Sequence, residues 1–180
     1  MVYFLLGTGF EPMEAVVPVD ILRRGGVEVR TLGIGATRIE AAHGIVIETD
    51  GTVEQAAAED AEMVVLPGGM GGVHSLRQSG AALEIVKKAY NDGKFVCAIC
   101  AGPTVLAGLG LLDGKRATCY PGCEPDMAGA VCTGVSVERD GRLITGRAPG
   151  SSADFGLALL AALRGEKAAE EVGKGLVYTR

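Results

Sequence analysis

Short apolar segments of strand length alternate along this chain with longer segments of helical pattern. The expected strands are at 2–6, 27–34, 63–66 and 95–99, and the expected helices are at about 12–24, from the glycine loop at 67–72 to Asn91, and at 104–109. Runs that are apolar throughout indicate strands buried on both faces. The alternation therefore predicts a doubly wound, mostly parallel α/β sheet with helices on both faces. No linker or repeat interrupts it, which indicates a single domain over residues 1–180.

The other elements are predicted from turn and capping signals. His43-Gly44 separates two strand-like segments, 38–42 and 45–49, which indicates a hairpin. A strand is expected at 116–119, followed by a strand pair that turns at Asp140-Gly141. The last strong helix is expected to begin near Ser151, with Asp154 completing a capping box, and to run through Leu163.

Composition and charge narrow the classes of partner. Hydrophobic residues make up 48% of the 180 residues but aromatic residues only 4%, so the core must be built from Ala, Val, Leu and Ile. The net charge of −5 argues against binding to nucleic acid or to an anionic membrane. The apolar segment 2–6 is too short for a signal peptide or a membrane span. A cytoplasmic location is therefore predicted.

The five cysteines do not form a pattern typical of disulfides or zinc. Their number is odd and their spacing irregular, unlike a secreted disulfide framework. Cys119, Cys123 and Cys132 have no neighbouring histidine to complete a zinc site, so no metal is expected. Cys97 falls in the middle of an expected strand, and Cys97 and Cys132 are interpreted as structural thiols.

Cys100 stands where an apolar strand meets a helix. It follows Phe95–Ile99 and precedes Ala101-Gly102, and Pro103 suits the first turn of a helix. This arrangement resembles a nucleophile elbow with cysteine in place of serine and a strained backbone. Helix N–H groups favour thiolate, so the sequence predicts a lowered pKa and a reactive Cys100. The alternative is a small buried hydrophobe.

Three strand ends carry small residues and are expected to meet at one edge of the sheet: Gly7–Gly9, Pro67–Gly69 and Cys100–Gly102. The first lacks the third glycine of a dinucleotide fingerprint, and the second lacks the Lys-Ser/Thr of a phosphate loop, so no cofactor is predicted. Backbone N–H groups of Gly68 and Gly69, with that of Ala101, could instead form an oxyanion hole beside Cys100. The alternative is that these loops are only tight turns.

Glu14 is the second candidate residue. It lies in the first turn of the expected helix at 12–24, and so points back toward the strand ends. A carboxylate at a helix start is common and needs no function. Together with Cys100, however, it suggests a site in which the carboxyl stays protonated beside the sulfur. Glu11 is the competing carboxylate.

Several segments together resemble the ThiJ/PfpI superfamily, and specifically its branch of the parkinsonism-associated protein deglycase. They are Glu11–Val16, Pro18–Gly26, Val64–Gly69, Ala98–Pro103 and Arg147–Ser152. The resemblance implies a flavodoxin-like fold and a homodimer.

By the same resemblance, Cys100 matches the reactive cysteine and Glu14 the buried acid that hydrogen-bonds its thiolate. Gly69 and Ala101 match the positions whose N–H groups face the reacting oxygen. Arg24 matches a position near the dimer and the site mouth, and Gly68, Tyr120 and Pro149 are further candidates for lining the site.

Two departures from the superfamily limit the chemistry. Several members have His-Pro where this chain has Tyr120-Pro121, and the protease-like branch has histidine where this chain has Ala101. The only histidines, His43 and His74, lie elsewhere in the sequence. A Cys–His dyad or a peptidase triad is therefore not supported.

Two functions follow as hypotheses. The first is a cofactor-free, slow enzyme in which the Cys100 thiolate attacks a 2-oxoaldehyde such as methylglyoxal, or its early protein adducts, and Glu14 moves the proton. The second is a non-enzymatic redox-sensing or chaperone-like stress protein that uses oxidation of Cys100. A small aldehyde or a glycated protein is the expected partner.

The expected helix at 13–22 carries more apolar surface than one face of a sheet needs to cover. Its apolar residues include Val16, Val17, Val19, Ile21 and Leu22. This excess favours packing against a second copy of the chain, and so a homodimer.

Overall fold

A seven-stranded sheet forms the centre of the computed structural model, which describes residues 1–179. Its order is β10-β11-β7-β6-β1-β2-β5, and β10 is antiparallel to its neighbour while the other pairs are parallel. Without the two edge strands, this is the order of flavodoxin-like folds. The strands are β1 (Val2–Leu6), β2 (Val29–Gly33), β5 (Gly51–Thr52), β6 (Met63–Leu66), β7 (Phe95–Ile99), β10 (Val137–Asp140) and β11 (Leu143–Gly146).

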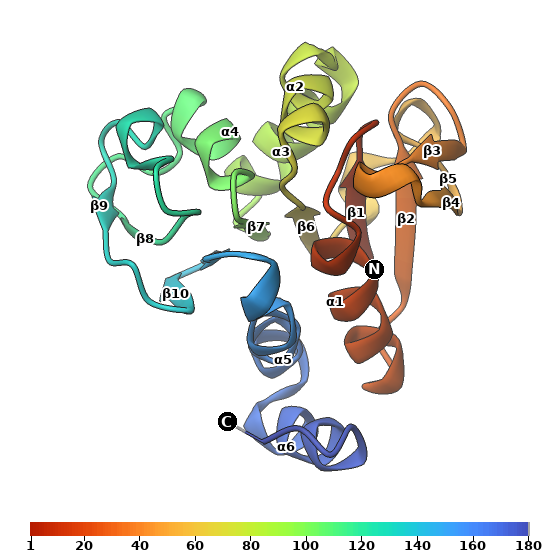
Figure 1. The fold of residues 1–180 in the computed structure, drawn as a ribbon, viewed down its shortest axis with the longest axis vertical. Helices are drawn as coiled ribbons and strands as arrows, with labels where there is room; N and C mark the ends of the chain where they lie inside the picture. The colour runs from red at the N-terminus through yellow and green to blue at the C-terminus, as the bar shows by residue number, and fades with distance from the viewer. Residues whose placement is uncertain (180) are drawn as a thin grey trace.

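Helices cover both faces of this sheet, as the sequence predicted (Figure 1). On one face lie α2 (Met70–Gln78), α3 (Gly80–Asn91) and α4 (Pro103–Gly108), and on the other lie α1 (Pro12–Arg24) and α5 (Ser152–Arg164). The last helix, α6 (Glu166–Gly175), packs against α5. No helix within residues 1–179 is long and apolar enough to cross a membrane.

The core is built from the apolar strands and the inner faces of these helices. All residues of β1, β6 and β7 are buried, which explains why these segments are apolar throughout rather than alternating. The closest helix contact is between α1 and α5. A Cβ placed on Gly156 of α5 would lie 3.0 Å from the Cα of Pro18 in α1, so the absence of a side chain at Gly156 allows this approach.

Two small sheets lie outside the central one. The strands β3 (Arg38–Glu40) and β4 (Val46–Glu48) form the predicted antiparallel hairpin. The strands β8 (Arg116–Ala117) and β9 (Val131–Cys132) pair in parallel, and β8 is two residues shorter than the segment expected at 116–119.

The elements predicted from the sequence differ from those of the structure in three further places. The helix expected to reach Asn91 without a break is two helices, because the Ser79 side chain accepts a bond from the Ala82 N–H and caps α3. Ser151 precedes α5 but its side chain makes no capping bond, so the predicted capping box is absent. The short β5 and the polar α6 were not predicted at all.

Candidate active site

The site lies where three parallel strands end beside one another. The chain runs from β1 outward to β2 and then returns to the other side of β1 to form β6, so the order of strand addition reverses between β1 and β6. Flavodoxin-like folds bind ligands at such a switch point, outside the carboxyl ends of the strands. Here β1 leads to Glu14, β6 leads to Gly68 and Gly69, and β7 leads to Cys100.

Cys100 occupies a strained elbow directly after β7. Its φ of +64° lies in the left-handed region, which is uncommon for a residue with a side chain. Its backbone is fixed on both sides, since its N–H donates to the Gly146 oxygen at 2.9 Å and its oxygen accepts from the Tyr120 N–H at 2.8 Å. The side chain is held nearly out of solvent, with 8% of the residue exposed.

Glu14 is fully buried in the first turn of α1. Its Oε2 accepts a hydrogen bond from the Gly68 N–H at 2.7 Å. Its Oε1 makes no hydrogen bond within the described residues, while the neighbouring Cys100 thiol lowers the pKa of the carboxyl. A buried carboxyl beside a thiol is placed to exchange a proton with it.

Gly68 separates these two side chains and has to be glycine. A Cβ at this position would lie 2.8 Å from both the Cys100 Cβ and the Glu14 Oε2. Either group would have to move away to make room for it. Because the Gly68 N–H is used by Glu14, it does not belong to the oxyanion hole for which it was considered.

Two other backbone N–H groups do point at the sulfur. The N–H groups of Ala101 and Gly69 lower the pKa of the Cys100 thiol by hydrogen bonding, against the larger effect of burial. Gly69 has a φ of +82°, and a Cβ there would meet the Gly9 oxygen at 2.5 Å, so this turn also requires glycine. Donors in this position would stabilise negative charge on sulfur or on an oxygen bound next to it.

Burial dominates the electrostatics of both groups. It raises the pKa of Glu14 to about 7, although the bonds from Cys100 and Gly68 act in the opposite direction. Burial also raises the pKa of Cys100, and a negative charge on Glu14 raises it further. The lowered thiol pKa predicted from the sequence is therefore wrong, because the N–H groups of Ala101 and Gly69 do not outweigh burial.

The two groups ionise as a pair. A charge on either one opposes ionisation of the other. Because the pKa of Glu14 is about 7 and that of the Cys100 thiol is raised above its ordinary value of 9.0, the carboxyl ionises first and the thiol keeps its proton. Thiolate forms when the Cys100 proton passes to the Glu14 carboxylate, and the N–H groups of Gly69 and Ala101 then stabilise the charge on sulfur.

A pocket of about 260 Å³ opens above Cys100. Four of the predicted residues besides Cys100 line it, namely Gly69, Ala101, Tyr120 and Pro149. The other lining residues are Glu11, Met70 and Cys123. Glu11, the competing carboxylate, caps α1 and stands at the pocket rather than at the sulfur. Met70 and Cys123 were not predicted to line it, because only the folded loops bring them there.

Arg24 is not brought to this pocket. It lies in the last turn of α1, at the end away from Glu14, and pairs with Asp20 at 2.7 Å. Neither histidine lines the pocket. His43 is in the hairpin, 3.8 Å from Glu11, and His74 is in α2. The geometry therefore offers no Cys–His dyad.

The remaining cysteines differ in exposure. Cys97 is fully buried in β7, in agreement with a structural thiol. Cys132 is exposed, so its interpretation as a structural thiol is wrong. Within residues 1–179, no group of three His, Cys, Asp or Glu side chains is arranged to hold a metal ion.

Known proteins are similar to this chain in sequence and in fold. The model of the DJ-1/PfpI family matches residues 1–162. The chain belongs to this family. It is 35% identical over 176 residues to protein dj-1beta of Drosophila melanogaster, covering 96% of this chain and 94% of that protein. It is 34% identical to a deglycase of Pyrococcus abyssi, over 83% of this chain and 90% of that protein.

Solved structures agree with this assignment. The crystal structure of Drosophila melanogaster DJ-1beta superposes with a TM-score of 0.94 at 33% identity, covering 99% of this chain and 98% of that one. Membership in the family and the flavodoxin-like architecture, both expected from the sequence, are confirmed.

Proposed function

We propose that this DJ-1/PfpI protein is a cofactor-free enzyme that attacks 2-oxoaldehydes such as methylglyoxal, or their early adducts on proteins, through Cys100. The observation that supports this most is the buried Glu14 carboxyl beside Cys100, since each group acts on the pKa of the other. Carbonyl addition needs a sulfur nucleophile and a nearby acid, and this pair supplies both from one buried contact.

The first step is addition of sulfur to the aldehyde carbon. The carbonyl oxygen gains negative charge as the C–S bond forms, and the N–H groups of Gly69 and Ala101 stabilise it. The proton held by Glu14 then neutralises this oxygen and leaves a hemithioacetal. The ionised Glu14 is now a base beside the adduct.

The second step is a proton transfer between adjacent carbons. Glu14 removes the proton from the former aldehyde carbon and returns it to the neighbouring carbon, while the hydroxyl proton passes from the oxygen of the first carbon to that of the second. These two transfers convert the hemithioacetal into a thioester of the 2-hydroxy acid. Water then cleaves the thioester and restores the thiol. The net reaction adds one water to methylglyoxal and gives lactate. With an adduct as substrate, Glu14 protonates the leaving amine or thiol instead.

The size of the pocket supports a small substrate. Its volume of about 260 Å³ lies below the range of sites for drug-sized ligands, roughly 300–1,000 Å³. Tyr120 lines this pocket and is 46% exposed. By the family resemblance, several members have histidine at this position. Since tyrosine is a poor base near neutral pH, all the proton transfer has to be done by Glu14, and slow turnover is expected.

The named relatives support the same class of activity. The Pyrococcus abyssi protein is called a deglycase, and its match extends over 83% of this chain. Glycated protein is accordingly a proposed substrate beside the free aldehyde.

A steady-state assay tests the proposal. Methylglyoxal loss and lactate formation are measured together for the wild type, Cys100→Ser and Cys97→Ser, since Cys97 is a matched thiol buried outside the pocket. Lactate formed by the wild type and Cys97→Ser but not by Cys100→Ser supports the proposal. Aldehyde loss without lactate would mean only reversible adduct formation, and would refute it.

Oxidation of Cys100 is a second proposed role, and one arrangement favours it. The N–H groups of Gly69 and Ala101 and a protonated Glu14 surround the sulfur, and all three could donate to the oxygens of a sulfinate. A solved relative, DJ-1 of Toxoplasma gondii, is described as oxidized. If turnover is absent while peroxide yields a stable Cys100 sulfinate, this role replaces catalysis.

Dimer formation is also proposed, on a smaller set of residues than the sequence suggested. In α1, Val19, Ile21 and Leu22 are buried within the chain. Met13 and Val16 remain 50% and 47% exposed, and the neighbouring hairpin exposes Ile45 and Val46. A second copy covering these residues would remove them from water. Light scattering across a dilution series should give twice the mass of 18.4 kDa, and Val16→Asp should shift it to the monomer.

A further inference from the structure

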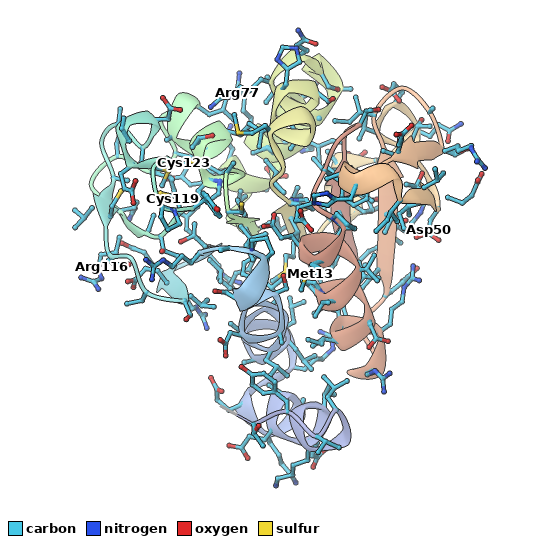
Figure 2. All side chains as sticks on the ribbon, viewed as in Figure 1. Met13, Asp50, Arg77, Arg116, Cys119 and Cys123 are labelled. Carbon is cyan, nitrogen blue, oxygen red and sulfur yellow. The ribbon has the colours of Figure 1, made fainter. Side chains whose placement is uncertain are left out.

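Two cysteines outside the Cys100 site lie near each other. Cys132 stands close enough to Cys119 to raise the pKa of that thiol, although the two residues are thirteen positions apart in the sequence. Figure 2 shows Cys119 with Cys123 on the segment that follows β8, away from α1. The contact therefore brings together two separate segments.

Backbone pairing fixes this contact. β8 and β9 are parallel, and Ala117 lies opposite Cys132. The Val131 N–H donates to the Lys115 oxygen at 2.8 Å, and the Thr133 N–H donates to the Ala117 oxygen at 2.9 Å, so Cys132 is held on both sides. The pairing of β8 with β9 therefore keeps the segment that carries Cys132 beside the segment that leads to Cys119.

The two thiols have unequal access to solvent. Cys132 is exposed, whereas Cys119 is only 4% exposed. Burial and the nearby Cys132 raise the pKa of Cys119 to about 12. A dissolved oxidant thus meets Cys132 first, and Cys119 is the buried partner that reacts with a neighbouring sulfur rather than with the oxidant.

We propose that Cys119 and Cys132 form a reversible disulfide when the protein meets a hydroperoxide. The Cys132 sulfur attacks the peroxide, the O–O bond breaks, and a sulfenic acid and an alcohol or water are formed. The Cys119 sulfur then attacks the Cys132 sulfur, the S–O bond breaks, and the Cys119 proton leaves with the hydroxyl as water. In total the two thiols lose two electrons, one from each sulfur, and these two electrons reduce the peroxide.

This disulfide would restrict the motion of the segment that forms one side of the Cys100 pocket. Tyr120, next to Cys119, lines that pocket, and its N–H bonds to the Cys100 oxygen at 2.8 Å. Cys123, also a lining residue, donates its N–H to the Tyr120 oxygen at 2.9 Å. A disulfide at Cys119 would therefore restrict the segment that shapes the pocket without using the Cys100 sulfur. The proposal does not depend on the proposed enzymatic activity.

Cys123 is the competing partner for Cys119. A charge on Cys123 also raises the pKa of Cys119, but Cys132 has the larger effect. Burial raises the pKa of Cys123 itself, and the charge of Arg77 in α2 opposes this rise. The Cys119–Cys132 contact is therefore the one that the geometry favours.

The test uses the full chain with Cys100→Ser, so that peroxide cannot act at the active-site sulfur. In this background the parent protein, Cys132→Ser and the matched control Cys123→Ser are treated with hydrogen peroxide and mapped by mass spectrometry. The parent and the Cys123→Ser protein should lose two hydrogen atoms and give a linked Cys119–Cys132 peptide that dithiothreitol separates. Cys132→Ser should give none.

A second readout is the melting temperature. It should rise on oxidation of the parent and fall back on reduction, because the bond closes a loop in the unfolded chain. The shift should be missing in Cys132→Ser, which alters only an exposed side chain and should fold. A Cys119–Cys123 linkage, an intermolecular linkage, or oxidation of Cys132 without any linkage would overturn the proposal.

Discussion

Cys100 and Cys132 are both free thiols, but their surroundings differ in almost every respect. Cys100 ends a buried strand of the central sheet, and backbone groups from three strand ends surround it. Cys132 is exposed on a two-residue strand and meets one other thiol. The comparison teaches that the proposed carbonyl chemistry relies on a backbone that holds Cys100 from several sides, whereas the proposed pairing of Cys132 relies only on a nearby thiol.

The largest expected effect separates the two thiols in the activity assay. Cys100→Ser should lower kcat/KM for methylglyoxal by at least about 10³-fold, because the nucleophile is lost while the pocket remains. Lactate formation is the measurement. Substantial lactate formation by Cys100→Ser would place the nucleophile elsewhere and end the distinction between the two regions.

Glu14→Gln should lower kcat by about 10²-fold or more, the usual size of a general acid–base contribution. The amide oxygen can still accept from the Gly68 N–H, so the fold should persist, yet no proton can be shared with sulfur. The measurement is kcat with the circular dichroism spectrum as control. Glu11→Gln is the matched variant at the pocket and should retain most of the activity. An equal loss in both variants would mean that turnover depends on the negative charge near the pocket and not on Glu14 in particular.

Stability should fall as the pH rises from about 4.5 to about 7. An unfolded Glu14 loses its proton near the model value of 4.5, but the folded one keeps it until about 7, so in this window the folded state binds the extra proton. The loss should amount to at most about 3 kcal/mol. Urea unfolding of the wild type and Glu14→Gln at several pH values measures it. The variant should lack this slope, and an equal slope in both would assign it to other groups.

Gly68→Ala should lower kcat/KM by roughly tenfold, a loss in the range expected when catalytic groups are misplaced by less than 1 Å. The new Cβ would meet Cys100 and Glu14 at 2.8 Å and push them apart. Gly150→Ala is a matched control, because nothing lies within 4 Å of a Cβ there. A Gly68→Ala protein with full activity would show that contact between the pair is not needed.

The smallest effect is expected at the other thiol. Under reducing conditions Cys132→Ser should keep kcat/KM within about twofold of the wild type, as do most exposed substitutions away from a site. The same assay measures it. A large loss would mean that the β8–β9 segment takes part in turnover, and the contrast between the two regions would have to be abandoned.

Much of the fold could be predicted because local pattern and tertiary structure agree. The apolar runs at β1, β6 and β7 could be strands only if both their faces were covered, and this requirement implies the helical layers. The break at Ser79 was missed although Ser-Gly is a turn signal, since apolar residues continue the helical pattern on both sides. The polar α6 has little apolar pattern of its own and depends on packing against α5.

The site was predictable to the extent that it depends on neighbouring residues in the sequence. The Cys100 elbow follows from a strand, small residues and Pro103, and Glu14 follows from its place in the first turn of α1. The direction of the Cys100 pKa shift was not predictable, because it depends on how deeply the fold buries the sulfur beside Glu14. For the same reason the sequence could not indicate that Cys123 faces the pocket or that Cys132 faces solvent.

The left-handed backbone at Cys100 also has a consequence for engineering. A side chain in this conformation costs about 1–3 kcal/mol, and glycine would adopt it freely. The protein therefore gives up stability at the residue on which its chemistry is proposed to depend, a known form of conflict between stability and activity. Selection for thermal resistance alone, without selection for turnover, would be expected to replace Cys100 with glycine and so to remove the reactive sulfur.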